Sequence, residues 1–274
     1  MTRRDLVTSA GAAALSAASQ SRVLGANDRM SVGLIGCGVR GNQLLPHFQK
    51  LNQAPLSAVC DVYRARGEAT QALAPQAKLF NDHRKLLEMP ALDAVVIATP
   101  DHWHAAIAMD ALNAGKDVYV EKPLTYRIDE GQRIVRAARL NHRICQVGAQ
   151  QRSGSHYIQA RDEFIRTGKL GKVRLVRTWW FDGGTDSLGR ANTSPAADPA
   201  RPTGHATPPG MDKKPADLDW ERYLGSASWR EWDPPQYFNF RNYRDFCGGI
   251  LTDKFALGGR GPHVHGSRRP RGRR

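Results

Sequence analysis

The feature that most constrains this chain is a glycine-rich turn in the segment Ser31–Gly41, which reads Ser-Val-Gly-Leu-Ile-Gly-Cys-Gly-Val-Arg-Gly. The apolar run before the glycines predicts a buried parallel strand, and residues 42–50 after them have the composition of a helix. A turn that binds the pyrophosphate of a dinucleotide needs this order of strand, turn and helix. Gly36 permits the tight turn, Gly38 lets the backbone approach the pyrophosphate, and Gly41 lets the helix pack on the strand.

A second apolar run, Leu56–Cys60, is followed by an acidic residue, Asp61, about 20 residues beyond the turn. A carboxylate at this point accepts hydrogen bonds from ribose hydroxyls and repels a 2′-phosphate. The sequence therefore predicts a bound dinucleotide and favours NAD, although Arg64, one turn later, leaves NADP open. Val39 and Arg40 complete the set of cofactor-binding candidates in the turn itself.

Strand-like and helix-like segments alternate through the first half of the chain, and this alternation predicts an α/β fold with a doubly wound parallel sheet. Ligands of such sheets bind beyond the carboxyl ends of the strands. The segments Gly36–Gly41, Asp61, Thr99–Pro100 and Glu121–Lys122 all follow expected strands, so we expect four loops to converge on one crevice. Further strands are expected at 78–80, 92–98, 117–120 and 144–147, and helices at 65–73, 83–88, 104–114 and 129–141.

The alternation stops near residue 150, and a second region extends from 151 to 253. We expect the aromatic side chains of this region to serve mainly as core or interface packing, although some are candidates to line a sugar site. In this region the sequence predicts a helix at 156–167, a strand at 173–181, a long surface excursion at 183–219 and an aromatic-rich stretch at 220–246.

The two ends of the chain have their own compositions. Arg3-Arg4 precedes a weakly apolar stretch at 6–18, and residues 1–29 therefore have the layout of a twin-arginine export signal. This layout predicts a periplasmic protein. The alternative is an ordinary N-terminal extension on a cytoplasmic protein. The stretch is too short and too weakly apolar for a membrane span.

The formal net charge is +14, and half of it lies in the tail 254–274, which has seven Lys and Arg residues and no acidic residue. The tail has no aromatic residue beyond Phe255 and no apolar period, so we expect a solvated appendage and no nucleic-acid partner. A basic interaction protein is a third functional class, and it predicts salt-dependent retention on nucleic acid that requires the tail. The four cysteines form no C-x-x-C pair, so we expect buried residues or free thiols and no metal site.

Four segments in this order resemble the Gfo/Idh/MocA oxidoreductases over roughly residues 30–253. They are Gly36–Gly41, Thr99-Pro-Asp-His-Trp-His104, Glu121-Lys-Pro123 and Gly248-Gly-Ile-Leu-Thr-Asp253. The resemblance implies a Rossmann domain at 30–150 followed by an α/β domain with an open, mostly antiparallel sheet. It also implies hydride transfer between nicotinamide and a sugar or polyol carbon, and a homo-oligomer built through the second domain.

The resemblance also implies roles for single residues. Lys122 is the leading candidate to orient the substrate hydroxyl and help remove its proton, because the proton must leave as the hydride departs. The alternative for Lys122 is a structural ion pair. Glu121 is expected near the nicotinamide end of the cofactor.

Thr99 and Pro100 are expected to shape the wall beside the nicotinamide, and either His102 or His104 is expected to touch the cofactor. Without the context of the family, each of these histidines reads as a packed or an exposed side chain.

Asp253 is the second catalytic candidate, but the sequence departs from the family here. The family pattern is Asp-x-x-x-His, and Leu257 stands where the histidine is expected. Codons for Leu257–Gly266 exist whose shifted reading frame encodes the apolar string Trp-Val-Asp-Val-Ala-His-Met-Tyr-Met-Gly, which suggests a frameshift and a truncated second domain. We therefore expect NAD binding with weak or absent turnover, and the alternative function is a non-catalytic dinucleotide-binding protein. Sequencing the gene beyond the codon for Asp253 tests this, because no family-like sequence in the other frame would refute it.

Overall fold

The computed structural model describes residues 29–51, 54–175, 210–249 and 252. The expected export signal, most of the surface excursion, Asp253 and the basic tail lie outside the described residues. No helix in the described ranges has the length and apolarity needed to cross a membrane.

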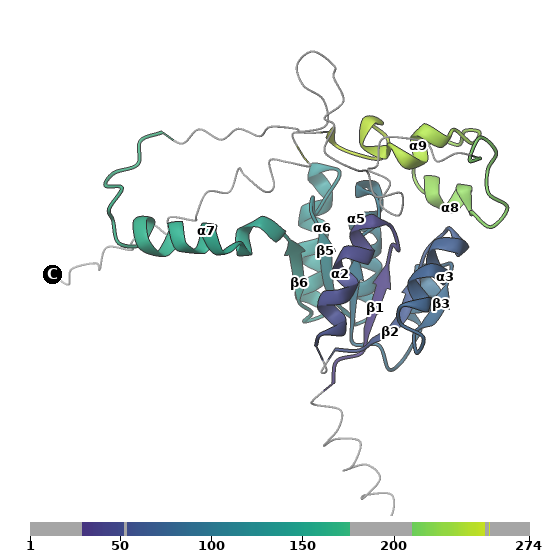
Figure 1. Cartoon of the computed structure of the whole chain (residues 1–274), viewed down its shortest axis with the longest axis horizontal. Coiled ribbons are helices and arrows are strands. Elements are labelled where there is room, and N and C mark those ends of the chain that lie inside the picture. The colour runs from purple at the N-terminus through teal and green to yellow at the C-terminus, as the bar shows by residue number, and fades with distance from the viewer. Residues whose placement is uncertain (1–28, 52–53, 176–209, 250–251, 253–274) are drawn as a thin grey trace, which may run out of the picture.

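A six-stranded parallel sheet in the order β3-β2-β1-β4-β5-β6 is the centre of the fold (Figure 1). The order reverses between β1 and β4, and doubly wound sheets bind their ligands at the carboxyl side of such a switch point. The predicted alternation of strands and helices is therefore confirmed. The strands are β1 Val32–Ile35, β2 Leu56–Cys60, β3 Lys78–Phe80, β4 Ala94–Ile97, β5 Asp117–Glu121 and β6 Cys145–Gly148.

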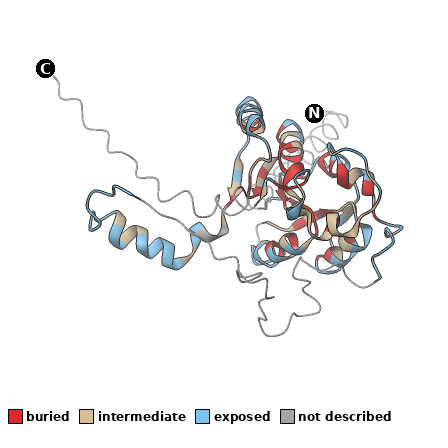
Figure 2. Cartoon of the chain, turned by 90° about the horizontal axis from the view of Figure 1, so that it is seen from above, coloured by how far each residue is buried: buried red, intermediate tan, exposed pale blue. Residues whose placement is uncertain are grey.

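The central strands β1, β2 and β4 are buried on both faces, which explains why they are nearly continuous apolar runs rather than alternating ones. Val32 and Leu34 of β1 belong to one core cluster with Leu44 and Leu45 of α2, whereas Ile35 faces the opposite cluster under α4, α5 and α6. Figure 2 shows the buried residues gathered around the sheet. The helices are α2 Val39–Gln49, α3 Arg64–Ala72, α4 His83–Leu87, α5 Asp101–Asn113 and α6 Ile128–Leu140.

The aromatic-rich stretch forms a small lobe, residues 217–247, that packs against the carboxyl end of the sheet (Figure 1). The backbone N–H of Asp219 donates to the Val62 carbonyl at 2.9 Å, and the indole of Trp103 donates to the Tyr223 carbonyl at 2.9 Å. The prediction of core packing is confirmed for the side chains that are buried in this lobe, which are Trp220, Tyr223, Tyr237 and Phe246; Trp229 is exposed. The lobe contains α8 Trp220–Leu224, α9 Pro234–Phe238 and the 3-10 turn η3 Phe240–Asn242.

The expected antiparallel sheet does not occur within the described ranges. Their only antiparallel pairing is an isolated bridge between Tyr63 and Leu218, because the lobe folds into short helices and turns around its aromatic cluster. Residues 173–175 of the expected strand are outside any strand, and the rest of that strand is not described.

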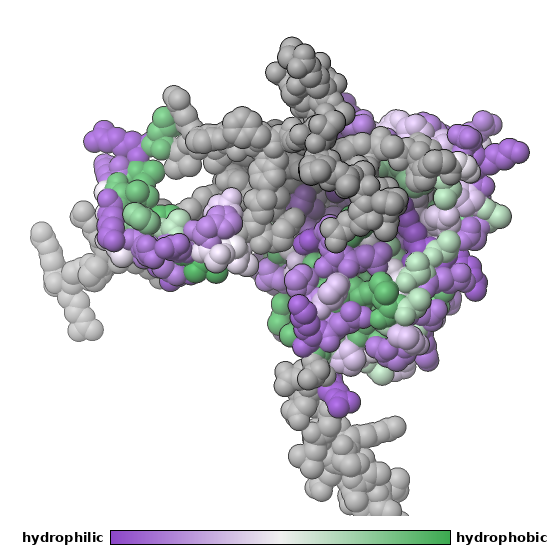
Figure 3. Space-filling view, in the orientation of Figure 1, coloured by the Kyte–Doolittle hydropathy of each residue, from purple (hydrophilic) through white to green (hydrophobic). Residues whose placement is uncertain are grey.

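The helix predicted at 156–167 is present over residues 155–165, and its second half is wound as a π-helix. After the 3-10 turn η1 Gln150–Ser153, an α-helix α7 Ser155–Ala160 is followed by the π-helical turn η2 Arg161–Ile165, and neither α7 nor η2 has a buried residue. This segment projects from the body of the domain, and Figure 3 shows apolar side chains on it. Its exposed apolar residues include Tyr157, Ile158 and Phe164.

Candidate functional site

The glycine turn lies at the switch point and is tightly packed on one side. Gly36 has φ +97°, and a Cβ atom on it would lie 2.7 Å from the carbonyl carbon of Ala98. A Cβ atom on Gly41 would lie 2.0 Å from the carbonyl oxygen of Gly36, which no side chain permits. These two glycines are therefore required by the fold itself.

Gly38 is different, because the protein leaves space around it. Its φ of −76° suits any residue, and the atom nearest to a Cβ built there is Arg66 Nη1 at 3.7 Å, an ordinary contact. Gly38 is the N-cap of α2, whose first turn contains no acidic residue and whose N–H groups favour an anion. The space around Gly38 and the helix end beside it fit the pyrophosphate of a dinucleotide.

Asp61 lies directly beside this turn. Its carboxylate accepts hydrogen bonds from the backbone N–H groups of Cys37 at 2.7 Å and Tyr63 at 2.8 Å. Burial raises the pKa of Asp61, while these two hydrogen bonds and the charge of Arg66 act in the opposite direction. Each carboxylate oxygen still has a second acceptor position, which suits a ribose hydroxyl.

An ion pair crosses the switch point. Arg40 in the first turn of α2 contacts Glu121 at the end of β5 with 2.7 Å between Nη2 and Oε1, and the Glu121 side chain is 5% exposed. Tyr119 also donates to this carboxylate at 3.4 Å. The pair joins the glycine turn to the strand end that carries Lys122, and nothing in the sequence pattern indicates this pairing.

Lys122 follows β5 and precedes Pro123, so it lies at the same edge of the sheet as the glycine turn. The side chain is partly buried. Arg40 and Asp61 lie at this edge as well. The four loops that were predicted to converge therefore do meet at this edge of the sheet. Asp253, the other catalytic candidate, lies outside the described residues.

The loop Thr99–Pro100 leads into α5, which begins at Asp101 and not at residue 104 as expected. His104 is therefore inside the helix and 1% exposed. Its Nδ1 lies 2.6 Å from the Pro123 carbonyl oxygen and its Nε2 lies 2.8 Å from the Thr99 carbonyl oxygen. The ring thus joins the loop after β4 to the loop that carries Lys122.

His102 packs against the aromatic lobe. Its Nε2 lies 3.0 Å from the Tyr223 carbonyl oxygen, and its ring is 5.0 Å from that of Phe246. Both histidine rings therefore contact protein groups at the edge of the site. A contact of either ring with the cofactor stays a prediction.

The burial of His102 has a consequence for stability. Burial lowers its pKa from 6.5 to about 4, so between these values the unfolded chain binds more protons than the folded chain. The contribution of His102 to the free energy of unfolding should be fully present above pH 6.5. It should fall by about 3 kcal/mol as the pH drops to 4. Urea unfolding of the wild type and of His102→Phe at pH 7.5 and 4.5 measures this contribution. We expect a smaller loss in the variant, whose Tyr223 carbonyl keeps its bond from Trp103.

The control for this experiment is His47→Gln, because His47 is exposed on α2 and its removal should leave the pH dependence unchanged. An equal loss of stability in the wild type and His102→Phe would contradict the role of His102.

Arg66 is a residue that the sequence reasoning missed. Its guanidinium lies 4.8 Å from the Tyr237 ring centre and borders Gly38. Arg64, the residue considered for NADP, instead contacts Glu68 at 2.7 Å with both side chains more than half exposed. No signal in the sequence distinguishes the two arginines, because the packing of Arg66 depends on the aromatic lobe.

The described residues contain no group of three or more potential metal ligands. Cys37, Cys60, Cys145 and Cys247 are free, and burial raises the pKa of the Cys37 thiol, which makes it unreactive.

Comparisons with known proteins agree with this geometry. Residues 30–149 match a family described as an oxidoreductase family with an NAD-binding Rossmann fold. The fold and the glycine turn thus define an NAD-binding Rossmann domain. The matching family model is that of the Gfo/Idh/MocA oxidoreductases, and the match extends over this domain alone.

Two curated relatives differ in their named activities. Inositol 2-dehydrogenase of Salmonella typhimurium is 30% identical over 159 residues, which cover 57% of this chain and 47% of the relative. A glycosyl hydrolase family 109 protein of Shewanella sp. is 32% identical over 174 residues and covers 52% of this chain and 37% of the relative. The chain therefore spans less than half the length of these relatives.

A solved structure carries a cofactor. The WlbA dehydrogenase of Chromobacterium violaceum, in complex with NADH and UDP-GlcNAcA, has a TM-score of 0.50 and 25% identity. It covers 53% of this chain, and 41% of the WlbA chain is matched.

Proposed function

We propose that this protein is an NAD-dependent oxidoreductase that transfers a hydride between nicotinamide and a carbon of a sugar or polyol. The observation that carries the proposal is the open space at Gly38 beside the N-terminus of α2, with Asp61 at the adjoining strand end. The inositol 2-dehydrogenase and WlbA relatives support a sugar or polyol as the substrate.

In this proposal Gly38, Val39 and Arg40 hold the pyrophosphate, and Asp61 holds the adenosine ribose. When bound, NAD supplies the carbon that accepts the hydride. Lys122 orients the substrate hydroxyl and takes part in removing its proton. The ion pair of Arg40 with Glu121 keeps the Lys122 loop next to the glycine turn. The wall beside Lys122 is the Thr99–Pro100 loop, which His104 fixes.

The experiment is a titration of the full chain with NADH, followed by assays with a panel of sugars and polyols. NADH binding together with NAD⁺-dependent oxidation of a panel member, even if slow, supports the proposal. Binding without turnover favours the alternative, a non-catalytic dinucleotide-binding protein. A matched panel of nitrophenyl glycosides covers the other activity named among the relatives, and hydrolysis without net redox change would contradict hydride transfer as the overall reaction.

The choice between NAD and NADP gives a second prediction. Arg66 borders Gly38, so we expect Arg66→Ala to weaken NADPH binding about tenfold and NADH binding less. Arg64→Ala should change neither affinity, because Arg64 contacts Glu68 at the surface. Fluorescence titrations with both nucleotides measure this, and a loss of NADPH affinity in Arg64→Ala alone would reverse the assignment.

Export to the periplasm and assembly into a homo-oligomer are proposals that rest on the sequence. Periplasmic location rests on Arg3-Arg4 and the stretch 6–18, and the homo-oligomer rests on the family. Cell fractionation of a tagged full chain, with and without Arg3→Lys and Arg4→Lys, tests the export route.

A further inference from the structure

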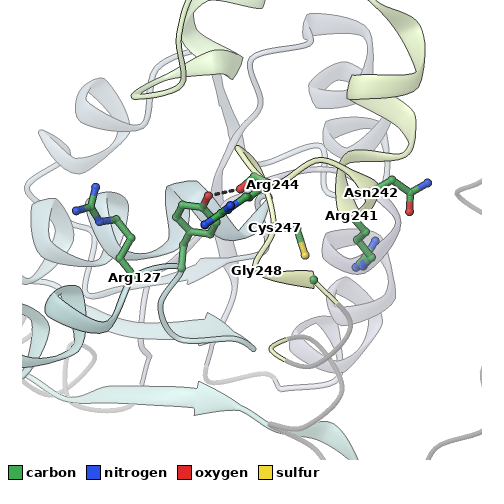
Figure 4. A pocket seen from close by; sticks show the side chains of 8 residues that line it. Arg127, Arg241, Asn242, Arg244, Cys247 and Gly248 are labelled. Carbon is green, nitrogen blue, oxygen red and sulfur yellow. Dashed lines mark hydrogen bonds between the residues drawn. The ribbon is translucent and has the colours of Figure 1, made fainter.

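A cavity of about 550 Å³ lies between the loop that follows Lys122 and the segment 241–249 of the aromatic lobe (Figure 4). Tyr126 joins its two walls, because the hydroxyl donates to the Arg244 carbonyl oxygen. The second wall is also attached to α5, where the backbone N–H of His102 donates to the Phe246 carbonyl oxygen at 3.3 Å. The cavity thus has one wall on the loop that follows Lys122, and the segment that forms its other wall is hydrogen-bonded to α5.

The lining of this cavity is rich in hydrogen-bond donors. Each arginine offers five N–H donors and no acceptor, and it stays protonated at every pH of interest. Glutamate and aspartate are absent from the lining formed by the described residues. The residues that line the cavity are Tyr126, Arg127, Arg241, Asn242, Arg244, Cys247, Gly248 and Gly249.

Two acidic side chains next to lining residues in the described part of the chain already have partners. Asp129 contacts Arg127 at 3.3 Å, and Asp245 forms an ion pair with Arg230, which is not part of the lining. Arg241 lies 4.6 Å from the Phe240 ring centre. Figure 4 shows Arg127 and Arg241 on opposite sides, with Arg244 and Cys247 between them.

The excess of hydrogen-bond donors over acceptors in the lining determines which class of ligand the cavity can bind. A neutral sugar presents hydroxyl groups, which need acceptors as well as donors, whereas a carboxylate or phosphate is acceptor-only and pairs well with guanidinium groups. We propose that this cavity binds the anionic group of an acidic sugar or polyol derivative, with Arg244 and Arg241 as its main contacts. That this anion belongs to the redox substrate rests on the proposed function.

The test compares ligands that differ in one group. Binding of glucose, glucuronate and glucose 6-phosphate to the full chain is measured by calorimetry, with and without NADH. We expect glucuronate, glucose 6-phosphate or both to bind at least about tenfold more tightly than glucose, with an affinity that falls as salt rises. The two acids separate a carboxylate site from a phosphate site.

Variants locate the binding site. Arg244→Ala and Arg241→Ala should each weaken the favoured acid about tenfold, since both side chains are exposed and their removal leaves the fold intact. Arg136→Ala on the exposed face of α6 removes the same charge outside the cavity and should have no effect. Equal affinity for glucose and both acids, no acid binding, or an equal loss in Arg136→Ala overturns the inference.

The arm without NADH separates the two proposals. Arginine-dependent acid binding in a chain that does not bind NADH would keep this site and refute the oxidoreductase. NADH binding with no preference for acids would refute the anion site and leave the proposed oxidoreductase standing.

Discussion

Replacing Gly38 with alanine should weaken NADH binding at least about 100-fold while the protein folds normally. The backbone of Gly38 has a φ of −76°, which alanine adopts without strain, and the nearest protein atom to the new methyl group is 3.7 Å away. The loss therefore has to come from the ligand, since the methyl group occupies the place where the backbone approaches the pyrophosphate. A 100-fold weaker complex corresponds to about 2.7 kcal/mol.

Gly38→Ser is the matched variant, because serine keeps a good N-cap for α2 and adds similar bulk. Both variants are titrated with NADH by fluorescence, and their unfolding is followed by circular dichroism. Unchanged NADH affinity in either variant would show that the dinucleotide does not lie against this glycine.

Gly41→Ala is expected to destabilise the domain by more than about 3 kcal/mol or to prevent folding. Its methyl group would lie 2.0 Å from the Gly36 carbonyl oxygen, and that oxygen belongs to a turn that is itself packed against Ala98. Relief requires α2 to move away from β1, which opens the core around Leu44 and Leu45. Urea unfolding monitored by circular dichroism measures the effect.

The control is Gly131→Ala in the interior of α6, where the nearest atom to a new methyl group is Thr125 Cγ2 at 3.9 Å. This variant should be more stable than the wild type by about 0.5–1 kcal/mol, because alanine restricts the unfolded chain and favours the helix. A Gly41→Ala protein that unfolds at the same urea concentration as the wild type would contradict the packing described for the turn.

The sequence predicted the strands well, and it predicted the starts of α3, α4 and α6 within one residue but not those of α2 and α5. β2 and β3 have the predicted bounds. β2 is buried on both faces and is therefore a nearly continuous apolar run. In contrast, α2 and α5 each begin three residues before the predicted start. Their first turns face the site and carry polar residues, so the apolar period that predicts a helix begins only one turn later.

The contacts that arrange the site were beyond sequence reasoning for a different reason. Arg40 and Glu121 are 81 residues apart, and only the strand order brings them together. Arg66 packs on Tyr237 because the aromatic lobe returns to the carboxyl end of the sheet. Long-range packing of this kind leaves no local pattern in the residues that take part.

The most direct measurement of the central claim is the change in backbone amide NMR signals when the full chain is titrated with NADH. If the dinucleotide binds as proposed, the largest shifts occur at Gly38, Val39, Arg40 and Tyr63, around the N-terminus of α2 and Asp61. Shifts confined to other parts of the chain, or no shifts at saturating NADH, would contradict a dinucleotide site at this turn.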